Sequence, residues 1–248
     1  MPMIAICIDE IPKRDFYALF VHKLEIFSTF ATNYKQKQYM GKIKHIVFDL
    51  GGVVIALSYE QAVKRFEEIG LKDARQHLDA FHQTGIFGQL EDGTIGKEAF
   101  RQELSKLIGR EVTAEECFYA WHGYVEAVPK RNLEMLTWLR QQGYRVSLLS
   151  NTNPYMMQWA QSSEFDGEGH PIDDYFDAMY LSYQLKVMKP SEQIFLSMLK
   201  GEQARAEEVL FIDDGKANVE AANRMGIQTL CPQNNEDWTG MLLAKLGL

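Results

Sequence analysis

The stretch His45-Ile46-Val47-Phe48-Asp49-Leu50-Gly51-Gly52-Val53-Val54 decides the fold of this chain. Its first apolar run ends on one carboxylate, Asp49, and the pair Gly51-Gly52 follows. An apolar run closed by two glycines predicts a buried parallel strand that stops at Asp49. Ligands bind beyond the carboxyl ends of such strands, and a carboxylate there needs a cation or hydrogen bonds. Asp49 is therefore a candidate metal ligand or nucleophile, with a simple turn residue as the alternative.

The composition is that of an ordinary globular protein. The chain has 248 residues, of which 46% are apolar and 24% charged, enough to bury a substantial core. A net charge of −8 without a Lys/Arg cluster argues against a nucleic-acid partner. No apolar run of about 18 residues is present, so no membrane span is expected. Cys7, Cys117 and Cys231 lie far apart, which favours a reduced, cytoplasmic protein over a disulfide scaffold.

Residues 1–40 differ in composition from the rest of the chain. The stretch from Phe16 to Phe30 is rich in aromatic residues, but charged residues interrupt it, which argues against a signal peptide. Met40 stands just before the predicted first strand. We therefore expect residues 1–40 to be an N-terminal extension that is not part of the core.

The pattern changes to helical after the first strand. Apolar residues recur at three- and four-residue intervals from Tyr59 to Ile69. The sequence Thr113-Ala114-Glu115-Glu116 has the pattern of a capping box and predicts the start of another helix. No strand is evident in this block. We predict that residues 58–128 form a helical insertion, with residues 41–57 and 129–248 forming an α/β core.

Strands and helices alternate in the remainder of the chain. This alternation favours parallel strands joined by right-handed helical crossovers. We therefore predict an α/β fold in which helices cover both faces of a parallel sheet. The strands expected after the insertion are Tyr144–Leu149, Tyr175–Leu181, Glu208–Ile212 and Ile227–Leu230.

Polar side chains stand at three strand ends, which parallel pairing brings to one edge of the sheet. They are Asp49, Ser150-Asn151 and Asp213-Asp214. The carboxylates repel one another unless a divalent cation lies between them, and oxygen ligands suit Mg²⁺. Ser150 and the amides that begin the next helix can bind an anion, and Lys189 adds a positive charge. These residues together predict a phosphate site with a carboxylate nucleophile.

Purely structural roles are the alternatives for several of these residues. Ser150 and Asn151 also fit the pattern of a helix cap, and Asp213-Asp214 also fits a helix start. Lys189 also fits an exposed turn, in which case Lys186 is the rival for its role.

Four segments, in this order, resemble the motifs of the haloacid dehalogenase-like (HAD) hydrolase superfamily. The resemblance covers residues 42–232, and the group that the chain resembles is the bacterial alpha-D-glucose-1-phosphate phosphatases. It implies a Rossmann-like core and identifies the helical insertion as an all-helical, C1-type cap, in which Glu91 and Gln89 are candidates for facing the substrate. The four segments are Phe48–Val53, Leu149–Asn153, Lys189-Pro190 and Phe211–Asp214 with Asn218.

The resemblance implies a Mg²⁺-dependent phosphatase that acts on small phosphate esters, sugar phosphates above all. Asp49 would attack phosphorus and form an aspartyl-phosphate. The implied Mg²⁺ ligands are Asp49, the backbone carbonyl of Gly51 and Asp214, with Asp213 as a direct or water-mediated partner.

The same resemblance assigns the phosphate-binding residues. Ser150 and the Asn151 amide would hold the phosphoryl oxygens. Lys189 would neutralise charge in the transition state, which is the usual electrostatic task in phosphoryl transfer. Asn218 would orient Lys189 or a metal-bound water.

Gly51 departs from the family pattern. Most phosphatases of the superfamily have a second Asp at this position, which acts as the general acid. An enzyme without that acid loses least when the leaving group departs well unprotonated, so we expect a preference for anomeric sugar phosphates such as glucose 1-phosphate. The alternatives are a catalytically weak phosphate- or protein-binding module on the same fold and, ranked lower, a haloacid dehalogenase.

Overall fold

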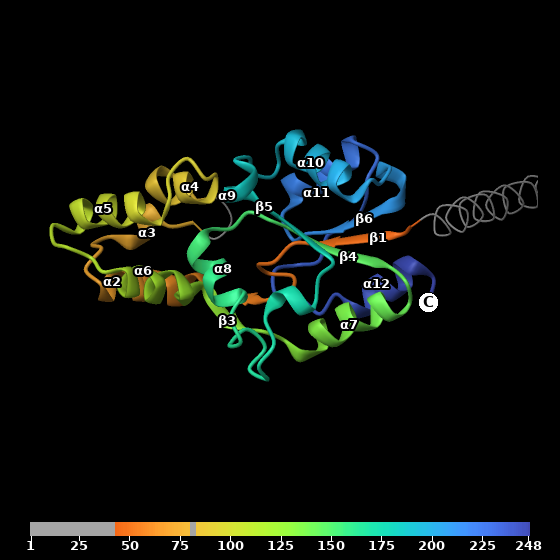
Figure 1. Cartoon of the computed structure of the whole chain (residues 1–248), viewed down its shortest axis with the longest axis horizontal. Helices are drawn as coiled ribbons and strands as arrows, with labels where there is room; N and C mark the ends of the chain where they lie inside the picture. The colour runs from red at the N-terminus through yellow and green to blue at the C-terminus, as the bar shows by residue number, and fades with distance from the viewer. Residues whose placement is uncertain (1–42, 80–82) are drawn as a thin grey trace, which may run out of the picture. The chain divides into compact units, whose positions relative to one another are not determined.

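A five-stranded parallel sheet forms the centre of the computed structural model, which describes residues 43–79 and 83–248 (Figure 1). The strand order is β5-β4-β1-β6-β7. Ile46, Val47 and Phe48 of β1 are completely buried, as expected for a central strand that is covered on both faces. The strands are β1 (His45–Phe48), β4 (Arg145–Ser150), β5 (Ala178–Leu181), β6 (Val209–Ile212) and β7 (Gln228–Leu230).

Helices cover both faces of the sheet (Figure 1). The alternation of side chains along β1 explains the two layers. Val47 packs with residues of α10 and α11, whereas Ile46 and Phe48 pack with residues of α7 and α12. The α/β fold predicted from the sequence is thereby confirmed. These helices span α7 (Lys130–Gln141), α10 (Glu192–Glu202), α11 (Lys216–Arg224) and α12 (Thr239–Leu246).

The segment between β1 and β4 is mostly helical. Its helices pack around the rings of Phe66, Phe87, Phe100 and Trp121, whose centroids lie 5.4–5.9 Å apart in the contacting pairs. The predicted capping box at Thr113 is present at the start of α6. The helices are α2 (Tyr59–Glu68), α3 (Ala74–His77), α4 (Gly85–Glu91), α5 (Lys97–Ile108) and α6 (Ala114–Trp121), followed by a 3₁₀ turn at His122–Tyr124.

Two short strands flank the helical segment. β2 (Ala56–Leu57) pairs antiparallel with β3 (Val125–Ala127), so the chain leaves and re-enters the core side by side. β3 lies inside residues 58–128, where the sequence predicted helices only, because three residues are too few to show an alternating pattern. The expectation for residues 1–40 lies outside the described residues. Within residues 43–79 and 83–248, no helix has the length and apolar character needed to span a membrane.

Candidate active site

Three carboxylates gather where two neighbouring strands end. Asp49 follows β1, and Asp213 and Asp214 follow β6, which pairs directly with β1. One oxygen from each lies within 4.8 Å of the other two. The structure therefore brings together the three acidic residues that the sequence placed at this edge.

Lys189 is buried within this cluster. Its Nζ lies 2.8 Å from Asp49 Oδ1 and donates to Asp213 Oδ2 at 2.7 Å and to the Leu149 carbonyl at 2.9 Å. Burial works against its charge, but the carboxylates of Asp213 and Asp49 raise the pKa of Lys189 above its usual value, so it stays protonated. Lys186, the rival residue, is exposed.

One lysine does not balance three acidic groups. Burial raises the pKa of Asp49, and the negative charges of Asp213 and Asp214 raise it further, although Lys189 opposes the shift. Burial and the Asp213 charge likewise raise the pKa of Asp214 to about 6. Raised carboxyl pKa values indicate that the cluster lacks positive charge. A group of carboxylate oxygens with too little positive charge around it is suited to bind a hard divalent cation such as Mg²⁺.

The Asp213 carboxylate is already occupied by hydrogen bonds. Besides Lys189, it accepts from the Gly215 backbone N–H at 2.7 Å and from Asn218 Nδ2 at 3.0 and 3.2 Å. Asn218 therefore contacts Asp213 rather than Lys189 itself. This leaves Asp49 and Asp214 as the carboxylates that are better placed to face a bound cation.

The residues after β4 support the same cluster. Ser150 is buried at the end of the strand, beside the cavity described below. The Asn151 side chain makes two hydrogen bonds to the main chain of Lys189. Its Oδ1 accepts from the Lys189 N–H at 2.8 Å, and its Nδ2 donates to the Lys189 carbonyl at 2.9 Å. The side chain of Asn151 is thus used to hold Lys189, a role that the sequence did not reveal.

The start of the next helix differs from the sequence-based expectation. Asn153 caps α8 (Pro154–Ala160), and its Oδ1 accepts from the backbone N–H groups of Tyr155 and Met156. The Thr152 N–H is bonded to Ser182 Oγ. These amides were predicted to bind an anion, but that part of the prediction is wrong because the chain satisfies them itself.

Both glycines after Asp49 lie in tight surroundings. Gly52 has a φ of +73°, and a Cβ there would collide with the carboxylate of Asp214. Gly51 has no such φ, but a Cβ would lie 2.5 Å from Cδ1 of Leu57. The side chain of Leu57 therefore fills the space where the second acid of the family pattern would begin.

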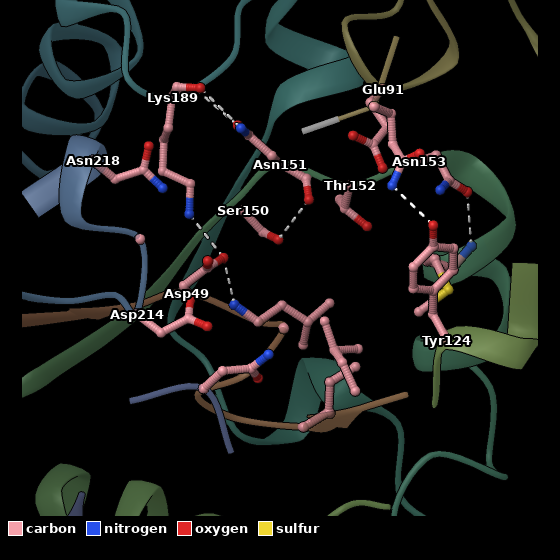
Figure 2. A pocket seen from close by; sticks show the side chains of 18 of the residues that line it. Asp49, Glu91, Tyr124, Ser150, Asn151, Thr152, Asn153, Lys189, Asp214 and Asn218 are labelled. Atoms are coloured by element: carbon pink, nitrogen blue, oxygen red, sulfur yellow. Dashed lines mark hydrogen bonds and ion pairs between the residues drawn. The ribbon is translucent and has the colours of Figure 1, made fainter. Parts of the chain in front are cut away.

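A cavity of about 630 Å³ lies over the carboxylate cluster (Figure 2). Gln89 is exposed and does not line the cavity. The sequence did not identify Gln83, Trp121 or Tyr124 as site residues, and it included Asn153 only as the last residue of the motif Leu149–Asn153. The lining includes Asp49, Gly51, Ser150, Asn151, Lys189 and Asp214 at the sheet edge, Asn153 at α8, and Gln83, Glu91, Trp121 and Tyr124 from the helical segment.

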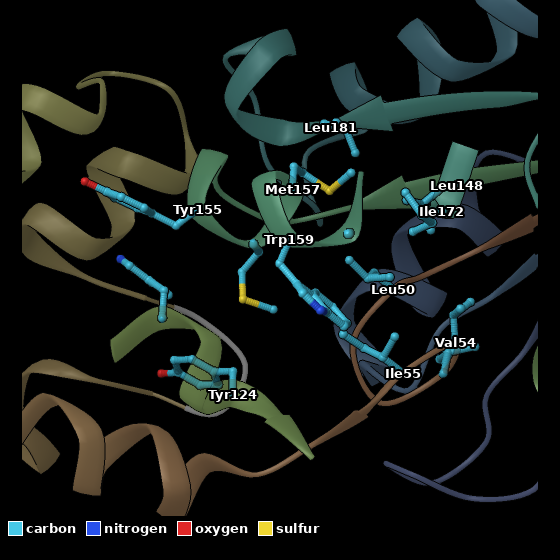
Figure 3. Packing of buried hydrophobic residues seen from close by; sticks show 14 of the residues in the cluster. Leu50, Val54, Ile55, Tyr124, Leu148, Tyr155, Met157, Trp159, Ile172 and Leu181 are labelled. Carbon is cyan, nitrogen blue, oxygen red and sulfur yellow. The ribbon is translucent and has the colours of Figure 1, made fainter. Parts of the chain in front are cut away.

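Apolar packing holds the loop after β1 in place (Figure 3). Leu50, Val54 and Ile55 of this loop belong to the same buried cluster as residues of β4, β5 and α8. Asn132 of α7 also donates to the carbonyls of Val53 and Val54, at 2.9 and 3.1 Å. Side chains far along the chain thus fix the backbone beside Asp49.

Comparisons with known proteins agree with this geometry. A family model described as haloacid dehalogenase-like hydrolase matches residues 43–226. The D-ribitol-5-phosphate phosphatase of Bacteroides thetaiotaomicron is 46% identical over 196 residues, which cover 79% of this chain and 95% of that protein.

Solved structures give the same result. A HAD-like family hydrolase from Porphyromonas gingivalis has a TM-score of 0.79 and 42% identity, covering 83% of this chain and 98% of that one. A HAD family enzyme from Bacteroides thetaiotaomicron, in complex with magnesium and inorganic phosphate, has a TM-score of 0.73 and 33% identity, covering 80% and 98%. These matches confirm the resemblance that the four motifs indicated. This chain belongs to the haloacid dehalogenase-like hydrolase family and is a phosphoric monoester hydrolase within it.

Proposed function

We propose that this protein removes the phosphate group from a small polyhydroxylated molecule, a sugar phosphate or sugar-alcohol phosphate, with the help of Mg²⁺. The observation that carries this proposal is the cluster of Asp49, Asp214 and the buried Lys189, which faces a cavity of about 630 Å³. A cavity of this size suits a small molecule. In this proposal residues 58–128 are the cap, and residues 41–57 and 129–248 are the core.

Mg²⁺ would be held by Asp49, Asp214 and the backbone carbonyl of Gly51, all of which line the cavity. Asp213 would act mainly on Lys189, with at most a water-mediated contact to the metal, because its oxygens already accept hydrogen bonds. The bound cation would offset the negative charge of the phosphoryl oxygens.

Asp49 is the proposed nucleophile. Its carboxylate attacks phosphorus, the ester P–O bond breaks, and an aspartyl-phosphate forms; water then attacks the same phosphorus atom and frees Asp49. Ser150 Oγ and the Asn151 backbone N–H would bind the phosphoryl oxygens. Lys189 would stabilise the charge that these oxygens carry in the transition state.

The walls of the cavity support a substrate rich in hydroxyl groups. A buried donor in its lining, Trp121 Nε1, has no hydrogen-bond partner among the described residues. Buried donors normally have partners, and a substrate hydroxyl would supply one. The 46% identical relative is named for ribitol 5-phosphate, so a sugar-alcohol phosphate is the first substrate to test. The anomeric preference inferred from Gly51 is a separate prediction, and it applies to an enzyme in which no other residue replaces the missing acid.

A phosphate-ester panel tests the proposal. Phosphate release would be measured from ribitol 5-phosphate, glucose 1-phosphate, glucose 6-phosphate and glycerol phosphate, with Mg²⁺ and with a chelator. We expect release that requires Mg²⁺ and a higher kcat/KM for the polyhydroxylated esters than for glycerol phosphate. Phosphate binding without turnover would favour the binding-module alternative, and halide release from a 2-haloacid in chelator would favour the dehalogenase.

A further inference from the structure

The leaving group of an alkyl phosphate needs a proton, and Gly51 offers none. The cavity lining in the described part of the chain holds three carboxyl groups, those of Asp49, Asp214 and Glu91. Asp49 and Asp214 belong to the proposed nucleophile and metal site. The hydroxyl of Tyr124 donates to the Asp79 carbonyl at 3.0 Å, and Lys189 is bonded to two carboxylates. Glu91 is the carboxyl group that remains for proton transfer.

Glu91 lies on the side of the cavity that the leaving group would face. It is the last residue of α4, in the helical segment, whereas Asp49 stands at the sheet edge (Figure 2). Attacking and leaving oxygens lie roughly in line on opposite sides of phosphorus. With Asp49 attacking from the core, the leaving oxygen therefore points away from the sheet, towards the helical segment.

We propose that Glu91 is the general acid and general base of this enzyme, in place of the carboxyl group that is missing at position 51. This proposal rests on the phosphatase mechanism proposed above. It adds the residue that donates and accepts the proton, since the motif around Asp49 contains no such residue.

The proton balance is complete with Glu91 alone. In the first step the Glu91 O–H proton passes to the leaving oxygen as the ester P–O bond breaks and the Asp49 Oδ–P bond forms. In the second step the Glu91 carboxylate takes a proton from water as the water oxygen bonds to phosphorus and the Asp49 Oδ–P bond breaks. Phosphate then leaves, with Glu91 protonated and Asp49 free again.

The surroundings of Glu91 suit this task. Its side chain is buried, and its backbone carbonyl accepts from Ser182 Oγ at 2.6 Å, which anchors the end of α4 to the core. Burial raises the pKa of Glu91 to about 8, the negative charges of Asp49 and Asp92 add to the shift, and the amide of Asn153 opposes it. Glu91 therefore carries a proton at neutral pH, and a pKa near the working pH is the best value for an acid that later acts as a base.

Asn153 is placed to position Glu91. Because Oδ1 of Asn153 accepts from two backbone N–H groups of α8, the direction of its Nδ2 is fixed. That Nδ2 is buried and has no well-formed hydrogen bond among the described residues, yet the amide favours the charged form of Glu91. We therefore assign Asn153 as a positioning residue that stabilises the Glu91 carboxylate after it has released its proton.

Leaving-group dependence tests the proposal. The variant Glu91→Gln keeps the shape of the side chain but cannot transfer a proton, and Glu115→Gln, an exposed change in the same helical segment, is the control. For the best alkyl phosphate of the panel, we expect Glu91→Gln to lower kcat/KM by about 10²–10⁴-fold. For p-nitrophenyl phosphate, whose leaving group departs without a proton, kcat/KM should fall far less.

The second step gives an independent readout. With p-nitrophenyl phosphate, Glu91→Gln should release a burst of about one equivalent of nitrophenolate per active site and then turn over slowly, because the aspartyl-phosphate lacks its base. Equal losses of kcat/KM on both substrates, or a change in KM alone, would show that Glu91 only binds substrate. An unchanged rate on the alkyl ester would also overturn the proposal. Failure of the phosphatase proposal itself is distinct, since the unaltered enzyme would then hydrolyse no ester.

Discussion

At the residue scale, the proposed chemistry depends on Asp49 and on two groups that contact it. Asp49 Oδ1 accepts from the Leu50 N–H at 2.7 Å and contacts Lys189 at 2.8 Å. Two contacts to one oxygen hold the carboxylate in a single orientation, which favours attack by the other oxygen. These contacts orient Asp49 for the proposed attack on phosphorus.

The variant Asp49→Asn should abolish turnover and leave the fold intact. An amide is a poor nucleophile and a weak metal ligand, while Lys189 keeps Asp213 as a partner at 2.7 Å. Phosphate release and thermal melting, measured on the same sample, check both statements. A rate equal to that of the unaltered enzyme would contradict the covalent mechanism.

The pKa of Glu91 can be tested through stability as well as activity. The folded-state pKa of about 8 lies above the usual value of 4.5, so between these pH values the folded chain holds a proton that the unfolded chain does not. The proton bound by Glu91 therefore contributes to the free energy of unfolding. This contribution is fully present below pH 4.5 and is lost as the pH rises through 8.

The glutamine variant cannot lose such a proton. We therefore expect the melting temperature of Glu91→Gln minus that of the unaltered protein to increase from pH 5 to pH 8. The difference should reach at least about 1 kcal/mol, or roughly 2–4 °C in a protein of this size. Melting both proteins at the two pH values, without metal, measures it. If the melting temperatures of the two proteins changed by the same amount between the two pH values, Glu91 would not be held protonated in the folded chain.

At the element scale, the loop after β1 depends on a helix that is distant in sequence. Asn132 of α7 donates to two loop carbonyls, and Nε1 of Trp238 donates to that of Val53 at 2.7 Å. The same loop carries Gly51 and its carbonyl. Hydrogen bonds from α7 and from Trp238, just before α12 (Thr239–Leu246), therefore hold the backbone that carries the proposed metal ligand.

The variant Asn132→Ala should destabilise the fold by about 2 kcal/mol and weaken Mg²⁺ binding. The reason is that the Val54 carbonyl loses the Asn132 donor, the Val53 carbonyl keeps only Trp238 Nε1 of its two side-chain donors, and the backbone around Gly51 becomes looser. Urea unfolding and the Mg²⁺ concentration for half-maximal activity are the measurements. Thr137→Ala is the matched control, because among the described residues its hydroxyl bonds only to the Leu133 carbonyl, within α7. Equal effects of the two variants would count against a link to the loop.

At the scale of the whole molecule, the described residues contain an extensive core. Two buried apolar clusters are formed among them by residues between 43 and 246, and the family model matches residues 43–226. The residues of the candidate site lie between Asp49 and Asn218.

A chain that begins at Met40 should accordingly melt at nearly the same temperature as the full chain and keep its kcat/KM. Differential scanning calorimetry on the two chains, together with the phosphatase assay, checks this. A large fall in melting temperature on removal of residues 1–39 would show that they contribute to the stability of the domain.

The sequence by itself determined the sheet and the chemistry at its edge. Apolar runs that end on Asp49, Ser150 and Asp213 are local patterns, and parallel pairing brings such strand ends together whatever the details of packing. The family motifs and the helical insertion follow from the same kind of local information.

Only the tertiary structure decided which side chains line the cavity together with Asp49. The family resemblance named both Glu91 and Gln89 as candidates, and of the two only Glu91 lines the cavity, with Trp121 and Tyr124. These residues come from segments far apart in the chain, and no periodicity in the sequence indicates that they lie around one cavity. Three further features depend in the same way on hydrogen bonds formed after the chain has folded. They are the position of Lys189, rather than Lys186, in the cluster, the hydrogen bonds of the Asn151 side chain to the Lys189 main chain, and the capping of α8 by Asn153. A local pattern fixes an element and the residue at its end, but the geometry between elements fixes what that residue touches.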